Sequence, residues 1–339
     1  MKVDSLLTGP IGDAGRTSVE LENAGYSGAW TAEGPHDPFL PLAVAAAHTQ
    51  GIELGTAIAV AFARNPMLLA NIGWDLQTLS RGRFVLGLGS QIKPHITKRF
   101  SMQWSRPAAR MREMVKAVRA IWDSWLHGTP LRFEGDFYRH TLMTPMFTPS
   151  PGNLEDLGPP PIMLAGVGPL MTEVAGEECD GFLCHPFSTE KYLREVTLPA
   201  LERGRAAAGA IMDGYEIAGP SFVVSGDTEE ATQRLATATR QQIAFYASTP
   251  AYRPVLEVHG WGDLQTELNT LSKRGQWEEM GRLIDDEILN TFAVVAPPEG
   301  IAPELGRRYG GIVDRISFYT PSQVDPDRWQ DVLAAIKAL

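Results

Sequence analysis

Two apolar runs joined by a helical segment constrain the fold of this chain most strongly. Residues 55–60 and 83–89 are apolar almost without alternation, and each run then breaks into small or polar residues. Such runs are typical of strands buried on both faces of a parallel sheet. Residues 66–80 between them have a helical pattern and end at the turn Ser80-Arg-Gly-Arg83. The stretch predicts a strand–helix–strand unit whose strand ends could face a ligand.

The same alternation runs through the whole chain. Strands are predicted at residues 2–8, 28–33, 52–60, 83–91, 161–165, 181–184, 215–225 and 313–319, each followed by a helical segment. The alternative is an open, doubly wound sheet, which usually has five to seven strands. Eight strands alternating with helices favour an α/β fold of the (β/α)₈ TIM-barrel type.

Two longer segments interrupt this rhythm. One, at about residues 126–159, follows the fourth strand and contains a hairpin-like alternation at 131–142. The other, at about residues 250–310, follows the seventh strand and contains helical stretches. Because strand–helix alternation resumes after each, both are interpreted as insertions into a single domain, residues 1–339. Long loops at the catalytic face of a barrel often gate substrate, so the second insertion is expected to be a lid.

Composition excludes several classes of protein. A net charge of −10 without a basic cluster argues against nucleic acid as a partner. No apolar run approaches the roughly 18 residues that span a bilayer, and the N-terminus is too short and polar for a signal peptide. Cys179 and Cys184 form no metal motif and are expected to be buried thiols. A cytoplasmic location is expected.

In a barrel, the active site lies at the carboxyl ends of the strands. Side chains of interest in those positions are few: Glu33 and His36, Ser90 and Gln91, and His185, together with the glycine turn Gly166-Val167-Gly168. There is no carboxylate pair and no clustered metal-ligand signature, so acid–base hydrolysis and metal catalysis are poorly supported. A redox cofactor fits such a site, because the cofactor supplies the reactive chemistry. The glycine turn precedes a helix and could bind phosphate, or could simply allow a tight bend.

Taken together, several motifs resemble the luciferase-like monooxygenase superfamily, and within it the branch of coenzyme F420-dependent oxidoreductases. The matching motifs are Asn65-Pro66, Asp75, Leu79-Ser80, Arg81-Gly82-Arg83, Leu86-Gly-Leu-Gly89, Ala165-Gly-Val-Gly-Pro169, Ala175-Gly-Glu177 and Asp180-Gly181. The resemblance spans nearly the whole chain and implies the same barrel fold.

The resemblance also implies roles for individual residues. Gly166, Val167 and Gly168 would hold the cofactor phosphate, and a cis peptide between Ala57 and Ile58 would form a bulge behind the deazaflavin ring. Ser90 and Gln91 would lie at the polar edge of the ring, with His185 also near the cofactor. Glu33 or His36 would handle a proton, although His36 could equally be a turn histidine. His95 is expected to face the ligand.

The expected activity is hydride transfer between C5 of the deazaflavin and a small organic substrate. Relatives that act on sugar phosphates carry lysine and threonine after the sixth strand, whereas this chain has Cys184-His-Pro-Phe-Ser188, so a non-phosphorylated substrate is expected. One alternative is an FMN-dependent monooxygenase with a reductase partner. Another is a homologue that binds a flavin or deazaflavin without catalysis. Relatives imply a homodimer, and Trp104, Trp122 and Trp125 are expected in the core or an interface.

Overall fold

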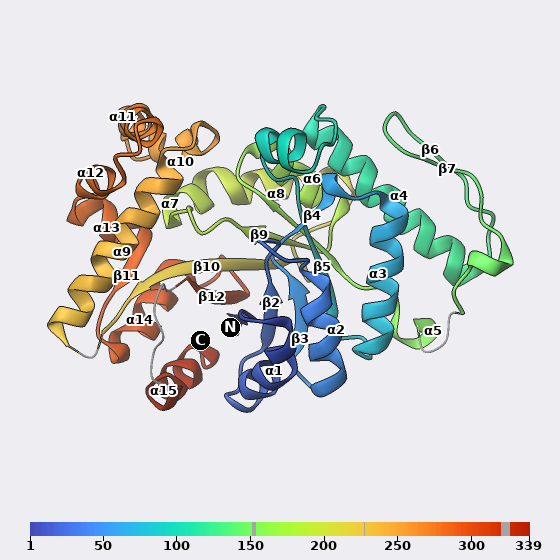
Figure 1. Ribbon diagram of the computed structural model, residues 1–339, viewed down its shortest axis with the longest axis horizontal. Helices are drawn as coiled ribbons and strands as arrows, with labels where there is room; N and C mark the ends of the chain where they lie inside the picture. The colour runs from blue at the N-terminus through green and yellow to red at the C-terminus, as the bar shows by residue number, and fades with distance from the viewer. Residues whose placement is uncertain (151–153, 227, 320–325) are drawn as a thin grey trace.

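Eight parallel strands close into a barrel at the centre of the molecule (Figure 1). The computed structural model describes residues 1–150, 154–226, 228–319 and 326–339. The barrel strands are β1 (Lys2–Leu6), β2 (Gly28–Thr31), β3 (Glu53–Thr56) with β4 (Ala59–Val60), β5 (Phe84–Gly89), β8 (Ile162–Gly166), β9 (Gly181–Cys184), β10 (Glu216–Val224) and β12 (Arg315–Tyr319). The ring closes where β10 pairs with both β9 and β12. The predicted (β/α)₈ barrel is confirmed.

Helices follow the strands and surround the barrel. They are α1 (Ala14–Asn23), α2 (Phe39–His48), α3 (Pro66–Leu79), α4 (Pro107–His127), α6 (Pro169–Glu178), α7 (Glu190–Tyr192) continuing into α8 (Leu198–Ala207), α9 (Glu229–Ala247) and α15 (Pro326–Lys337). The acidic residues at 227–230 predict the start of the helix after the seventh strand, and Asp227 among them lies outside the described residues. None of the helices in the described part of the chain is both long and apolar enough to cross a membrane.

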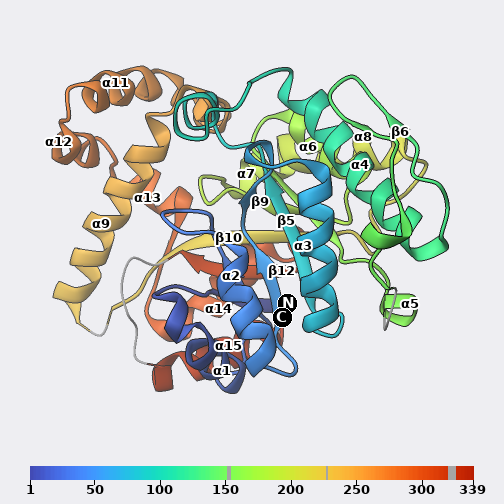
Figure 2. The ribbon, with the colours of Figure 1, turned by 45° about the vertical axis from the view of Figure 1, so that its right-hand side comes forward.

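The two insertions leave the barrel on opposite sides (Figures 1 and 2). The first contains the hairpin β6 (Phe133–Glu134) and β7 (Arg139–His140) and the short helix α5 (Leu154–Leu157), with residues 151–153 outside the description. The second contains α10 (Arg253–Glu257), α11 (Gly262–Lys273), α12 (Trp277–Arg282), α13 (Asp286–Phe292), β11 (Ala293–Val295) and α14 (Pro298–Tyr309). Strand β11, which sequence patterns missed, pairs with β10 outside the closed ring.

The predicted third strand is split by a bulge. β3 pairs with β5 through Leu54↔Phe84, and β4 pairs with it through Ala59↔Leu88, so the register slips by one residue between them. The Ala57–Ile58 peptide within the bulge is cis, as the resemblance implied. Gly87 allows this close approach, because a Cβ there would lie 1.7 Å from the carbonyl oxygen of Thr56. The Thr56 hydroxyl also donates to the Gly87 carbonyl oxygen at 2.7 Å.

Other motifs on which the family resemblance depends have structural explanations. Asn65 caps α3 by accepting a hydrogen bond from the backbone N–H of Leu68 at 3.0 Å. Arg83 fastens the turn after α3 to the preceding loop, because its guanidinium donates to the carbonyl oxygens of Thr49 and Ile52. Arg81 has a φ of 57°, so this turn passes through the left-handed region. These motifs therefore position β5 rather than contact a ligand.

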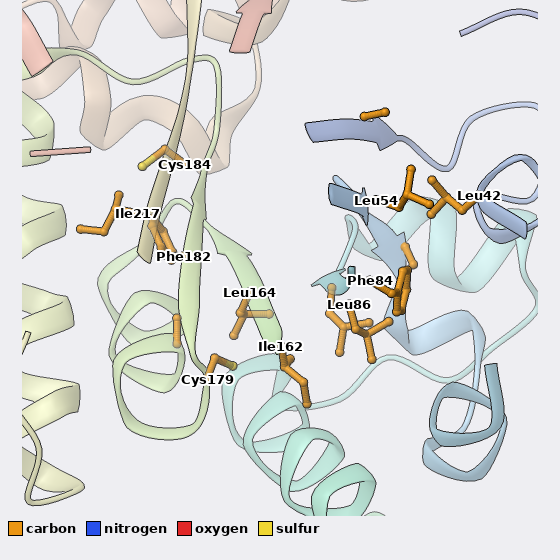
Figure 3. Close-up of a cluster of buried hydrophobic side chains, with 14 of the residues drawn as sticks. Leu42, Leu54, Phe84, Leu86, Ile162, Leu164, Cys179, Phe182, Cys184 and Ile217 are labelled. Carbon is orange, nitrogen blue, oxygen red and sulfur yellow. The ribbon is translucent and has the colours of Figure 1, made fainter. Parts of the chain in front are cut away.

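Alternating residues of the strands divide into two apolar layers. Outward-facing side chains, among them Leu54, Leu86, Ile162, Leu164 and Phe182, pack in the main core beneath the helices (Figure 3). Cys179 and Cys184 are free, buried thiols in the same core, as expected. Inward-facing Trp30, Val85, Met163 and Leu183 form a separate cluster inside the barrel. This inner layer divides the barrel into a closed floor and an open upper part.

The floor is an ionic network at the amino ends of the strands. Arg315 is fully buried and donates to both carboxylate oxygens of Asp4, at 2.6 and 2.8 Å. It also bonds to Glu53 and Glu216, and Lys2 bridges the same two carboxylates. Burial raises the pKa of Asp4, although Arg315 opposes this shift. The Arg315 guanidinium lies 4.7 Å from the centre of the Trp30 ring.

Candidate functional site

A cavity of about 730 Å³ lies at the carboxyl ends of the strands and extends past the inner apolar layer as far as Asp4 of the floor. Leu6, Ala165, Cys184 and Ser317 contribute to it from four different barrel strands. Its size is within the range of small-molecule and cofactor pockets. Within the described residues, no group of three or more His, Cys, Asp or Glu side chains could hold a metal ion. The cavity is therefore a candidate site for an organic cofactor or substrate.

All eight residues expected to bind the cofactor line this cavity. They are Ala57, Ile58, Ser90, Gln91, Gly166, Val167, Gly168 and His185. They come from the bulge, from the end of β8 and from the loops after β5, β8 and β9. The structure therefore brings together residues up to 128 positions apart, between Ala57 and His185.

The glycine turn supplies backbone donors at one wall. Gly168 precedes α6 as its N-cap, Pro169 occupies the first turn, and none of the described side chains caps this end. The first N–H groups of a helix have no partner within the helix, which makes such an end suitable for an anion. A Cβ at Gly168 would have no heavy atom within 4 Å, so the space beside it is open. The residues present fit a phosphate group.

The bulge and the loop after β5 form another wall. Ala57 and Ile58 both line the cavity, and Ile58 packs against Gly89, where a Cβ would approach it to 2.8 Å. Gln91 has a φ of 57°, and its side chain accepts a hydrogen bond from the backbone N–H of Ile92 at 2.9 Å. The Ser90 hydroxyl donates to the Gln91 carbonyl oxygen at 3.1 Å. This wall is mostly apolar, with polar atoms at one edge, which suits a flat heteroaromatic ring.

His185 lies between the cavity and a cluster of tyrosines. Its Nδ1 accepts a hydrogen bond from the backbone N–H of Phe187 at 3.0 Å, and its Nε2 lies 3.2 Å from the Tyr252 hydroxyl oxygen. The ring packs edge-on against Tyr246 with centroids 4.9 Å apart. Burial lowers the pKa of His185 to about 4. The side chain is therefore neutral at pH 7.

Glu33, expected to handle a proton, does not line the cavity. Its carboxylate accepts hydrogen bonds from the backbone N–H of Val60 and from Arg64, both at 2.6 Å. The side chain is 6% exposed. Its own backbone N–H donates to the Ile58 carbonyl oxygen at 3.1 Å. In this structure Glu33 therefore stabilises the bulge through its hydrogen bonds to Ile58 and Val60.

The two other histidines expected near the reacting ring are also outside the cavity lining. His36 is exposed in the loop between β2 and α2. His95 is exposed at the start of a short helix, His95–Arg99, in the loop after β5. That loop contacts the β2–α2 loop, because Arg99 donates a hydrogen bond to the Gly34 carbonyl oxygen. Both histidines therefore sit on neighbouring rim loops.

The cavity also includes residues that sequence reasoning did not select. Among them are Trp30, Lys93, Tyr246, Tyr252 and Tyr319. Trp104 lines the cavity too, whereas Trp122 and Trp125 are buried in the core as expected. Of the residues at 250–310, Ala251 and Tyr252 reach the cavity, while most apolar side chains of α10–α13 pack with α9 in a second core. The second insertion thus contributes two residues from its beginning to the site.

Several known proteins are similar to this chain in sequence. The chain is 55% identical over 316 residues to an uncharacterized protein of Mycobacterium tuberculosis, covering 93% of this chain and 92% of that protein. It is 25% identical to a 5,10-methylenetetrahydromethanopterin reductase of Archaeoglobus fulgidus, covering 92% and 90%. It is 27% identical to a putative coenzyme F420-dependent oxidoreductase of M. tuberculosis, covering 84% of each.

Solved structures share the fold. The coenzyme F420-dependent tetrahydromethanopterin reductase of Methanopyrus kandleri superposes with a TM-score of 0.78 at 20% identity, covering 99% of this chain and 96% of that one. The FMN complex of the oxygenating constituent of 3,6-diketocamphane monooxygenase from Pseudomonas putida superposes with a TM-score of 0.68 at 16% identity, covering 99% and 97%. The luciferase-like monooxygenase family model matches residues 2–315. The chain therefore belongs to the luciferase-like monooxygenase family.

Proposed function

We propose that this protein is a coenzyme F420-dependent oxidoreductase that transfers a hydride between C5 of the deazaflavin and a small, non-phosphorylated organic substrate. The observation that carries the proposal is the pairing of two walls in one cavity: a glycine turn with open backbone donors and an apolar bulge with a polar edge. Together they match a ligand that has both a phosphate and a flat ring. The M. tuberculosis relative at 27% identity supports F420 as that ligand.

The chain's own residues would divide the work of binding. Backbone N–H groups at Gly166, Val167 and Gly168 hold the phosphate, Ala57 and Ile58 support the ring, and Ser90 and Gln91 bond to its edge. When bound, the deazaflavin supplies two-electron hydride transfer. We further propose that Glu33 or His36 handles a proton and that His95 faces the ligand, although Glu33 is already paired with Arg64.

The lining of the cavity supports a substrate without phosphate. Among the described residues that line it, Lys93 carries the one ammonium group, and no arginine is present. Away from Lys93, a second phosphate would lie among apolar and tyrosine side chains and would lose hydration without a cationic partner. A small, weakly polar molecule is better suited to the part of the cavity that apolar and tyrosine side chains line.

A parallel titration with F420 and FMN tests the cofactor, with intrinsic tryptophan fluorescence as the signal. Trp30 and Trp104 line the cavity and report on ligand binding, while Trp122 and Trp125 in the core give a constant background. We expect saturable binding of F420 and a much weaker response to FMN. Preference for FMN would instead support the monooxygenase alternative and a search for a reductase. Binding of F420 without turnover on any alcohol, carbonyl or hydroxy compound would support a non-catalytic carrier.

We also propose that the protein is a cytoplasmic homodimer that pairs through its early helices. Leu40 on α2 is 54% exposed, and Leu68 and Leu79 on α3 are 56% and 47% exposed. Exposed leucines on neighbouring helices are suited to an interface between copies. Sedimentation velocity should give a dimer for the wild type, and Leu68→Glu should shift it toward monomer. A monomeric wild type at micromolar concentration would exclude this proposal.

A further inference from the structure

Four aromatic side chains form one wall of the cavity, and we call them the aromatic wall: His185, Tyr246, Tyr252 and Tyr319. His185 follows β9, Tyr246 belongs to α9, Tyr252 opens the second insertion, and Tyr319 ends β12. The His185 and Tyr252 rings have centroids 4.6 Å apart. Tyr246 and Tyr319 bond to each other through their hydroxyl groups at 2.9 Å. Elements distant in sequence thus place three hydroxyl groups at one side of the cavity.

Hydrogen bonding fixes which nitrogen of His185 carries its proton. The backbone N–H of Phe187 donates to Nδ1, so that nitrogen must hold a lone pair. A neutral imidazole then carries its hydrogen on Nε2, and Nε2 lies 3.2 Å from the Tyr252 hydroxyl oxygen. His185 is therefore the donor in this pair, and Tyr252 is the acceptor.

This assignment leaves the Tyr252 hydroxyl hydrogen without an acceptor. Among the described residues, His185 is the one hydrogen-bond partner of that hydroxyl group. Burial raises the pKa of Tyr252, so the hydroxyl stays protonated at neutral pH. Because the residue lines the cavity, the free hydrogen is available to a ligand oxygen there. A hydroxyl group that already accepts a hydrogen bond is also a better donor, because bonds in a chain polarise one another.

We infer that Tyr252 donates a hydrogen bond to the oxygen of a carbonyl or hydroxyl compound bound in the cavity, with His185 as the positioning residue that orients it. The inference rests on the proposed function for the reaction itself, since hydride transfer at a C–O carbon requires that oxygen to be held. It names the substrate class as small oxo or hydroxy compounds. Tyr246 and Tyr319 supply apolar faces beside the bound carbon skeleton.

A pair of probes that differ only in the oxygen tests this inference in the full-length protein. Acetophenone carries a carbonyl group, and α-methylstyrene replaces that C=O with C=CH₂ at nearly the same shape. Wild-type protein should bind acetophenone about five to ten times more tightly, the ratio expected for one neutral hydrogen bond. Tyr252→Phe should bind both probes equally. Tyr138→Phe is the matched control, because its hydroxyl accepts a bond from Arg110 outside the cavity; it should keep the wild-type ratio.

Infrared spectroscopy gives a readout that a purely structural role would not change. With acetophenone labelled with ¹³C at the carbonyl, the C=O band of the bound probe should lie at lower wavenumber in wild type than in Tyr252→Phe. His185→Asn keeps the bond to Phe187 through its side-chain oxygen but is too short to reach Tyr252. Its band should fall between the two, because the tyrosine is present but no longer oriented.

Three results would overturn the inference. Tyr252→Phe could keep the wild-type preference while Tyr246→Phe loses it, which would assign the donor to the Tyr246–Tyr319 pair. Tyr252→Phe could weaken F420 binding itself, which would assign the hydroxyl to the cofactor. Wild type could bind F420 but not acetophenone up to its solubility limit, which would exclude this substrate class. If acetophenone binds and F420 does not, the oxygen site stands and the proposed cofactor falls.

Discussion

The two ends of the barrel treat polar groups in opposite ways. At the floor, Arg315 is fully buried and bonds to Asp4, Glu53 and Glu216. At the open end, the backbone donors of the glycine turn and the hydroxyl hydrogen of Tyr252 face a cavity. Buried polar groups that are fully paired fix a structure, whereas donors directed into a cavity are available to a ligand. We therefore expect the floor to stabilise the barrel and the open end to bind the ligand.

Removing the central cation of the floor should have the largest effect on stability. In Arg315→Met, three carboxylates lose their shared partner, and only the partly exposed Lys2 remains. Breaking a buried ion pair in this way costs about 3–5 kcal/mol. Urea unfolding at pH 7 measures this loss.

Arg307→Met is the matched control, because Arg307 is 61% exposed and pairs with Glu304 at the surface. It should cost about 1 kcal/mol or less. Equal destabilisation of the two variants would contradict the role assigned to the floor.

The open end should be sensitive to acid through His185. Its pKa is near 6.5 when unfolded and about 4 in the folded protein, so the unfolded state binds the extra proton between these values. Stability contributed by the neutral ring is complete above pH 6.5 and is lost as the pH falls toward 4. At pH 5 the loss relative to pH 7 should be roughly 2 kcal/mol.

Comparing wild type with His185→Asn at pH 7 and pH 5 isolates this contribution, because Asn does not titrate and other groups change equally in both. The titratable groups that face the ring are Tyr246 and Tyr252, which do not ionise in this range. The free energies of unfolding from urea titrations should converge at acid pH. Parallel curves would show that His185 is not a buried neutral group.

The ion pair between Glu33 and Arg64 at the open end should have a smaller effect on stability. Glu33→Gln keeps an oxygen that can accept from the Val60 N–H but removes the charge opposite Arg64, which is 16% exposed. The expected loss is about 1 kcal/mol. Thermal unfolding checks the stability, and F420 titration checks binding, which should change little. A large loss of activity without loss of stability would restore Glu33 as the proton-handling residue.

The sequence predicted the barrel well because its strands are buried on both faces and read as continuous apolar runs. No sequence pattern marks the split between β3 and β4. A bulge leaves the apolar run unchanged and alters only the register in which these strands pair with β5. Strand β11 is three residues long and lies among helices of the second insertion. Its pairing with β10 depends on tertiary contacts that no local pattern contains.

The candidate site was partly predictable for a related reason. Ser90, Gln91, the glycine turn and His185 directly follow strands, so the barrel rule collects them without knowledge of distant contacts. Tyr252 lies in the second insertion, and only the folded structure brings it to His185, 67 residues away. Glu33 also follows a strand, but its pairing with Arg64 turns the carboxylate away from the cavity. Strand position therefore locates the site, and long-range pairing decides which of its residues face the ligand.

The most direct test of the division between the two ends is a substitution that stabilises the helix at the glycine turn and blocks the anion. Asp is a favourable N-cap, and Gly168 has a φ of −79°, which any residue can adopt, so Gly168→Asp should keep or raise the melting temperature. Its carboxylate would occupy the open space beside the turn and repel a phosphate.

Thr228→Asp is the matched control, because it changes the N-cap of α9 outside the cavity. The measurement is the dissociation constant of F420 in both variants, together with their melting temperatures. We predict binding at least about tenfold weaker, roughly 1.4 kcal/mol, for Gly168→Asp and unchanged binding for Thr228→Asp. Unchanged F420 binding in Gly168→Asp would contradict the assignment of the open end as the cofactor site.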